Sequence, residues 1–124
     1  SKNYGVGVVI GEITNDQVGD RFATIELDQI AVKGKTEAVT IFGLLGGPEM
    51  QDEADYQNLR ETHKQMLISY RSQDFGQAEE LCKTCRTIPG SPEVLYDLYD
   101  ERIEEYKENP PGPDWDGVFV ATSK

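Results

Sequence analysis

Basic residues are scarce in this sequence, which has 12 lysines and arginines against 23 aspartates and glutamates and a formal net charge of -11 at pH 7. A surface this negative repels nucleic-acid backbones and anionic lipids, so we expect no nucleic-acid partner and no membrane contact by this segment. A site for an anionic ligand would need a local patch of lysine or arginine side chains.

Long hydrophobic runs and cysteines are also scarce. No run approaches the about 18 apolar residues that span a bilayer, and no apolar stretch follows a basic start, so we expect neither a membrane span nor a signal peptide. The two cysteines, Cys82 and Cys85, offer no disulfide framework, which is typical of a reducing cytosol. Hydrophobic residues make up 37% of the chain, which is enough for a modest core.

The first part of the chain has short apolar and alternating runs that are typical of strands. They predict, in order, a short buried strand, a turn or short helix, and two strands that pair antiparallel, over residues 6–12, 13–20, 21–32 and 38–46. Gly34, between the last two strands, can adopt the positive φ that a hairpin turn often needs. Because the first strand is apolar throughout, we expect it to be a central strand without its neighbours, and this half to be the end of a larger domain.

The second part has helical periodicity after a linker that is rich in glycine, proline and acidic residues. Three apolar faces are predicted: Tyr56, Leu59, His63, Met66, Leu67 and Tyr70; Phe75, Ala78, Leu81, Cys82 and Cys85; and Leu95, Leu98, Tyr99, Ile103 and Tyr106. Ser91 is the expected N-cap of the third helix, with Pro92 in its first turn. The stretch SYRSQDFGQAEEL, which joins the first two helices, is similar to a tetratricopeptide helix pair.

The C-terminal tail, NPPGPDWDGVFVATSK, combines prolines with the only tryptophan and an apolar run. Leaving Trp115 and the neighbouring Val118, Phe119 and Val120 in water would cost several kcal/mol. We therefore expect the tail to dock back as an edge strand or an extended clamp.

Cys82 and Cys85 have the spacing of metal ligands, but a zinc site usually needs four ligands, and the only histidine, His63, lies on another predicted helix. Both cysteines fit the apolar face of their helix, so core packing is favoured. His63 also lies on an apolar stripe and is expected to be a core residue with satisfied hydrogen bonds. A solvated helix face is predicted for Glu101, Glu104 and Glu105, and no binding or catalytic role is assigned to them.

The stretches KNYGVGVVIGE and DRFATIELDQIAVKGKTEAVTIFGLLG form a strand, a short helix and a hairpin with a Lys-Gly-Lys turn. Together they resemble the C-terminal end of class III adenylate and guanylate cyclase catalytic domains. The residues that carry this resemblance are Lys2, Tyr4, Gly5, Val6, Leu27, Asp28, Val32, Lys33, Gly34, Lys35 and Val39. Ala38 stands where that family usually has proline. The stretches YRSQDFGQAEEL and PPGPDWDGVFVATSK also resemble the cytoplasmic tail of bacterial membrane-anchored cyclases with an extracellular sensor.

The resemblance implies an α+β chain: the last strands and hairpin of a ferredoxin-like cyclase domain, with a small tetratricopeptide-like helical extension. The implied ranges are 1–46 for the catalytic lobe, 47–54 for the linker, 55–108 for the helical extension and 109–124 for the docking tail. The parent enzyme would convert ATP to cyclic AMP and pyrophosphate in signal transduction. It would act as a homodimer with Mg or Mn, on the cytoplasmic side of the inner membrane.

By the same resemblance, Lys33 contacts the terminal phosphates of the nucleotide across the dimer interface, and Lys35 assists from the same turn. The family's two metal-binding aspartates and its transition-state Asn and Arg have no counterpart in these 124 residues. We therefore expect this chain to be inactive by itself, with no catalytic residue and no cofactor of its own. The alternative interpretation is a protein-interaction or regulatory module in which the tetratricopeptide-like helices bind a partner and the hairpin is only scaffold. The choice between ATP and GTP stays open.

Overall fold

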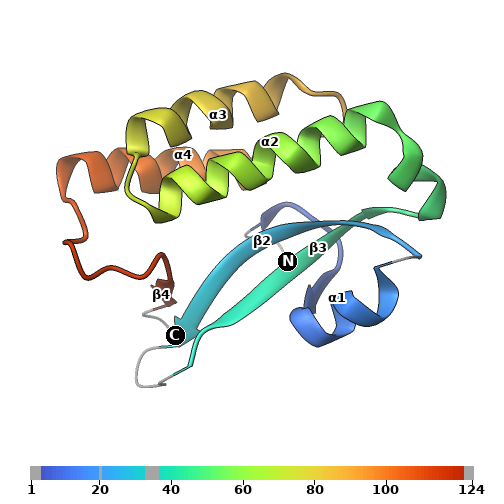
Figure 1. Cartoon of the computed structure of the whole chain (residues 1–124), viewed down its shortest axis with the longest axis horizontal. Coiled ribbons are helices and arrows are strands. Elements are labelled where there is room, and N and C mark those ends of the chain that lie inside the picture. The colour runs from blue at the N-terminus through green and yellow to red at the C-terminus, as the bar shows by residue number, and fades with distance from the viewer. Residues whose placement is uncertain (1–3, 20, 33–36, 122–124) are drawn as a thin grey trace.

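The computed structural model describes residues 4–19, 21–32 and 37–121, which fold into an α+β structure. A four-stranded mixed sheet in the order β1-β3-β2-β4 lies below a group of three long helices, and a short helix lies on the other side of the sheet (Figure 1). The elements are β1 (Val9–Gly11), α1 (Glu12–Val18), β2 (Ala23–Val32), β3 (Val39–Gly46), η2 (Pro48–Asp52), α2 (Ala54–Arg71), α3 (Phe75–Thr87), α4 (Glu93–Glu108) and β4 (Phe119–Ala121). Within these described ranges, no helix combines the length and the apolar character needed to cross a membrane.

The predicted hairpin is confirmed, because β2 and β3 pair antiparallel along nearly their whole length. Its register contains a bulge: Glu26 opposes Phe42 and Asp28 opposes Ile41, so Leu27 is an extra residue in β2. A bulge breaks the alternation of a strand, and two consecutive residues can then face the same side. Leu27 and Asp28 are accordingly both buried, the latter only 1% exposed.

The first strand was expected to be a central strand without its neighbours, and its central place in a larger sheet stays a prediction. In the described part of the chain, β1 is an edge strand that pairs only with β3, and the residue before it, Val8, is 50% exposed. Gly5, with a φ of +75°, precedes it, and α1 begins directly after it at Glu12, so only three residues remain for pairing. An apolar run indicates a buried strand only where neighbours cover both sides, and the run itself does not specify those neighbours.

One hydrophobic core joins the sheet to the three long helices. Val6, Ile25 and Leu27 contribute from the sheet side, and the helices contribute the predicted faces. All six residues predicted for α2 are buried, whereas Leu81, Leu98 and Tyr106 are only partly buried. In α4, Tyr96 and Arg102 are buried beyond the predicted set, because side chains of this helix reach both α2 and β2.

The ends of α4 differ from one another in how they meet the rest of the chain. The prediction that Ser91 is the N-cap of α4 was wrong, because Pro92 occupies that position without a side-chain hydrogen bond. The Ser91 hydroxyl instead lies 3.5 Å from the carbonyl of Arg86. Ser91 therefore donates its side-chain hydrogen bond to a main-chain carbonyl near the end of α3. After α4, the Trp115 ring packs against Tyr70 and Tyr106, at centroid distances of 5.4 and 5.1 Å.

Beyond Trp115 the tail returns to the sheet. β4 pairs in parallel with the last residues of β2, from Ile30 opposite Phe119 to Val32 opposite Ala121, and forms the edge opposite β1. It leaves the first part of β2, from Ala23 to Gln29, without a strand on that side in the described chain. This uncovered edge of β2 lies beneath α2.

Candidate functional site

Lys33 and Lys35, the predicted phosphate-binding residues, lie outside the described residues, as do Lys2 and Gly34 of the same motif. The structure does describe the stem of their hairpin. Two other residues of the motif meet there: the Tyr4 hydroxyl donates a hydrogen bond to Asp28 Oδ2 at 2.9 Å, and this connects the segment before β1 to the middle of β2.

Asp28 is the most heavily bonded carboxylate of the stem. Arg102 of α4 donates to both of its oxygens, from Nη1 to Oδ1 at 3.0 Å and from Nη2 to Oδ2 at 2.8 Å. The Tyr99 hydroxyl lies 3.4 Å from Oδ1 and donates more closely, at 2.5 Å, to the carbonyl of Leu27. Burial opposes the charge of Arg102, but the bonds to Asp28 outweigh it and raise the arginine's pKa further above its ordinary value. The pair is thus a fixed, charged link between hairpin and helix.

The surroundings of this pair reinforce it. Burial, followed by the Asp28 charge, raises the pKa of Tyr4 to about 12, so this phenol stays a hydrogen-bond donor at neutral pH. The Phe119 ring of β4 lies over the Arg102 guanidinium, 3.7 Å from its central carbon to the ring centroid. Tyr4, Tyr99 and Arg102 thus all lie within hydrogen-bonding distance of Asp28, and the cluster is explained as a buried structural link.

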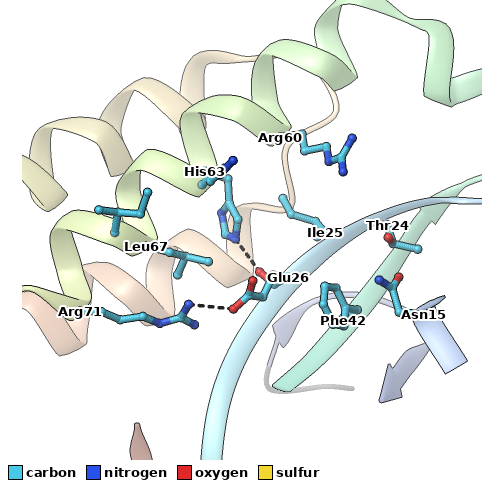
Figure 2. A pocket seen from close by; sticks show the side chains of 11 residues that line it. Asn15, Thr24, Ile25, Glu26, Phe42, Arg60, His63, Leu67 and Arg71 are labelled. Carbon is cyan, nitrogen blue, oxygen red and sulfur yellow. Dashed lines mark hydrogen bonds and ion pairs between the residues drawn. The ribbon is translucent and has the colours of Figure 1, made fainter. Parts of the chain in front are cut away.

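A cleft of about 400 Å³ lies between α2 and the uncovered edge of β2 (Figure 2). Side chains of α1, β2, β3 and α2 line it: Asn15, Thr24, Ile25, Glu26, Phe42, Arg60, His63, Lys64, Leu67, Ile68 and Arg71. It gathers three cationic side chains, and none of its residues was singled out as a ligand-binding group from the sequence.

Strand pairing determines which main-chain groups of β2 face the cleft. Leu44 of β3 donates its N–H towards β1, at 3.1 Å, so the neighbouring Gly43 faces β2, where it pairs with Ile25. Successive residues of a strand direct their N–H and C=O groups to opposite edges. Thr24 and Glu26 therefore direct theirs to the uncovered edge.

Both carbonyls on this edge already accept hydrogen bonds from α2. The Tyr56 hydroxyl donates to Thr24 O at 2.6 Å, and His63 Nε2 lies 2.5 Å from Glu26 O. Because a carbonyl only accepts, Nε2 carries the imidazole proton, and Nδ1 accepts from the Tyr96 hydroxyl at 2.9 Å. His63 is 2% exposed, which confirms the predicted core histidine with satisfied hydrogen bonds. Burial lowers its pKa to about 4, so it is neutral at pH 7.

The cationic side of the cleft comes from α2. Arg71 Nη1 lies 2.8 Å from Glu26 Oε2, while its Nε and Nη2 are buried without a hydrogen-bond partner in the described chain. Arg60 and Lys64 stand on the same side of the helix. Among the lining residues, three cations thus face one carboxylate, in a chain whose formal charge is -11. Asn15 Oδ1 is also buried and unpaired there, and the two ends of an amide are assigned only by their surroundings.

The cysteines do not line this cleft. Cys82 and Cys85 are both fully buried, which confirms core packing, and burial raises their thiol pKa values to about 12 and about 11. Glu101, Glu104 and Glu105 are exposed, as predicted. Among the described residues no group of three or more His, Cys, Asp or Glu side chains is placed to hold a metal ion.

No family model, no curated protein and no solved structure matches this chain.

Proposed function

We propose that this chain is the C-terminal part of a class III adenylate cyclase, whose complete catalytic domain converts ATP to cyclic AMP and pyrophosphate. The observation that carries the proposal is the order of elements around the motif. A short strand, a short helix and two antiparallel paired strands follow one another, and the Lys-Gly-Lys sequence lies between these two strands in the sequence. The bond between Tyr4 and Asp28, two residues of the motif, adds support.

The proposed chemistry gives Lys33 a supporting electrostatic role. In cyclisation the ribose 3′-hydroxyl attacks the α-phosphate, the bond to the β-phosphate oxygen breaks, and pyrophosphate leaves while the hydroxyl proton passes to a base. Negative charge grows on the phosphate oxygens, and a lysine beside them stabilises it. Metal ions, Mg or Mn bound by other parts of the parent, supply most of the activation. Lys35 would assist from the same turn, and ATP would lie at the interface of a homodimer.

The Asp28–Arg102 link fits this role because a catalytic group must be held to within about 0.5 Å by supporting contacts. Asp28 lies in the strand that leads into the turn, and Arg102 holds it with two hydrogen bonds. The helices and the tail would then hold the hairpin in a fixed position. The whole segment would lie on the cytoplasmic side of a membrane-anchored parent.

The test uses the proposed parent enzyme, with Lys33→Ala and, as a matched control, Lys83→Ala at an exposed position of α3. We expect Lys33→Ala to lower kcat by about tenfold to a hundredfold without changing the melting temperature, because one electrostatic contact to the transition state is lost. Lys83→Ala should retain full turnover. Unchanged turnover in Lys33→Ala would contradict the proposal and favour the interaction module. The 124-residue chain alone, given ATP and manganese, should produce no cyclic AMP; robust production would contradict the expected inactivity.

A further inference from the structure

We propose that the cleft between α2 and the uncovered edge of β2 binds a small organic oxyanion, a carboxylate or a phosphate monoester with an apolar body. The proposal concerns this cleft alone and does not depend on the cyclase proposal. It rests on three observations about the residues in Figure 2: which hydrogen-bonding groups are still available, what charge they carry, and what surrounds them.

The available main-chain and cationic groups of the cleft are donors. The carbonyls of Thr24 and Glu26 are occupied by Tyr56 and His63, and the Glu26 carboxylate accepts from Arg71. The N–H groups of Thr24 and Glu26 face the same uncovered edge, and the Nε and Nη2 of Arg71 have no partner among the described residues. A ligand that only accepts hydrogen bonds therefore fits this edge. An added peptide strand does not, because it would also need the two carbonyls as acceptors.

The charge of the cleft favours an anion over a neutral acceptor. Arg60, Lys64 and Arg71 are spaced by four and seven residues, so they share one side of α2. Arg60 and Arg71 are about 16 Å apart along the helix, at about 1.5 Å per residue, so a small ligand cannot touch both. Arg71, which is partly buried and has two nitrogens without a partner in the described part of the chain, would bind the oxyanion directly. The two exposed cations would attract it from solution.

The remaining walls are apolar and suit a ligand with a hydrocarbon part. Phe42 of β3 and Leu67 and Ile68 of α2 line the cleft, and Ile68 is 53% exposed although it is apolar. A volume of about 400 Å³ exceeds what a bare inorganic anion needs. A ring or short aliphatic body beside the oxyanion would cover this surface, so a bare phosphate ion should bind more weakly than its phenyl ester.

The experiment is a titration of the chain followed by the amide and arginine side-chain signals in proton–nitrogen NMR spectra. The probes are phenyl phosphate, benzoate, inorganic phosphate and benzyl alcohol, which has the ring without the charge. We expect saturable shifts of the Thr24 and Glu26 amides and of Arg71 Nε–H with phenyl phosphate or benzoate. Tighter binding of one of these two would identify the oxyanion, and inorganic phosphate should bind more weakly than phenyl phosphate.

Arg71→Gln should weaken binding of the preferred probe by about tenfold or more, since a charge-assisted pair of hydrogen bonds is lost. If Arg71→Gln does not fold, Lys64→Gln tests the same cleft and leaves the ion pair between Arg71 and Glu26 intact. Lys64→Gln is expected to weaken binding several-fold at low salt. Arg21→Gln, an exposed arginine outside the cleft, is the matched control and should bind as the parent chain does.

Three results would overturn the proposal. One is an absence of saturable shifts with both organic anions. The second is binding of benzyl alcohol as tight as that of benzoate, which would make the cleft an apolar pocket without anion selectivity. The third is equal loss of affinity in Arg21→Gln and in the folded cleft variants, because the anion would then be bound by the overall field of the chain rather than by the cleft.

Discussion

At the residue scale, His63 joins the sheet to two helices through a neutral ring. Its protonated Nε2 donates to Glu26 O and its Nδ1 accepts from Tyr96, so a second proton would displace the Tyr96 bond and add a charge in a buried place. The other positive group nearby, Arg71, also disfavours protonation. The imidazole thus works as a polar connector between α2, α4 and β2.

This arrangement predicts a loss of stability in mild acid. The pKa of His63 is about 4 in the folded chain and about 6.5 when unfolded, so between these values the unfolded state binds more protons. The contribution is complete above about pH 6.5 and shrinks as the pH falls towards 4. We expect the free energy of unfolding in urea to fall by about 2 kcal/mol between pH 7.5 and pH 5.

The control is His63→Gln, which cannot titrate. Because His63 is the only histidine in the chain, the variant should be less stable at pH 7.5 but should lose much less stability on acidification. A parallel decline of both proteins between pH 7.5 and pH 5 would assign the pH dependence to carboxylates and would refute this role for His63.

At the scale of single elements, two glycines give opposite expectations for the same substitution. Gly43 of β3 is buried, and an added methyl carbon would lie 2.9 Å from a Val6 methyl and 3.2 Å from Leu27. Gly76, near the start of α3, has open space around it. Gly43→Ala should therefore destabilise by about 1–3 kcal/mol, whereas Gly76→Ala should stabilise by about 0.5 kcal/mol. Thermal or urea unfolding measures both, and a neutral Gly43→Ala would mean that the side chains of Val6 and Leu27 can move aside freely.

The elements that the sequence predicted well are those with a local signal. The apolar spacing from Tyr56 to Tyr70 repeats every helical turn, so α2 could be predicted from the sequence. The hairpin could also be predicted, because its two strands are close neighbours in the sequence. The edge position of β1 and the bulge at Leu27 depend on which strands pair, and no local pattern encodes that. Ser91 was mistaken for an N-cap because the residue type fits either end of a tight connection.

The cleft could not be predicted, because its groups come from segments far apart in the sequence and its selectivity depends on main-chain orientation. Arg71 and Lys64 look like ordinary solvated residues of a helix, and only strand register turns Thr24 and Glu26 towards them. The burial of Arg102 was not predicted for a related reason. A charged residue next to Ile103 suggests a surface position unless a buried carboxylate, here Asp28, is known to lie beside it. The sequence did contain a signal for this buried ion pair: an arginine within an apolar helical face, together with an aspartate in the Leu-Asp motif of the hairpin.

At the scale of the whole molecule, the Asp28–Arg102 pair connects the hairpin to the C-terminal helix. Removing one partner leaves a buried charge uncompensated, so Asp28→Ala or Arg102→Ala should each cost about 3–5 kcal/mol. The double variant should cost clearly less than the sum of the two, which a double-mutant cycle in urea measures. Lys107→Ala, which removes an exposed ion pair with Glu79, is the comparison and should have little effect. Additive effects of the two buried substitutions would show that the pair is not coupled.

The parallel pairing of β4 with β2 has a consequence for the order in which the chain folds. It joins Ile30–Val32 to Phe119–Ala121, and closing so long a loop costs entropy before any contact repays it. The hairpin and the α2–α3 pair can form early from near neighbours, whereas we expect β4 to pair only after the helices have assembled. We then expect the tail to be the first part to detach in brief native-state openings, and each such opening would lift Phe119 from Arg102 and admit water to the ion pair beneath it.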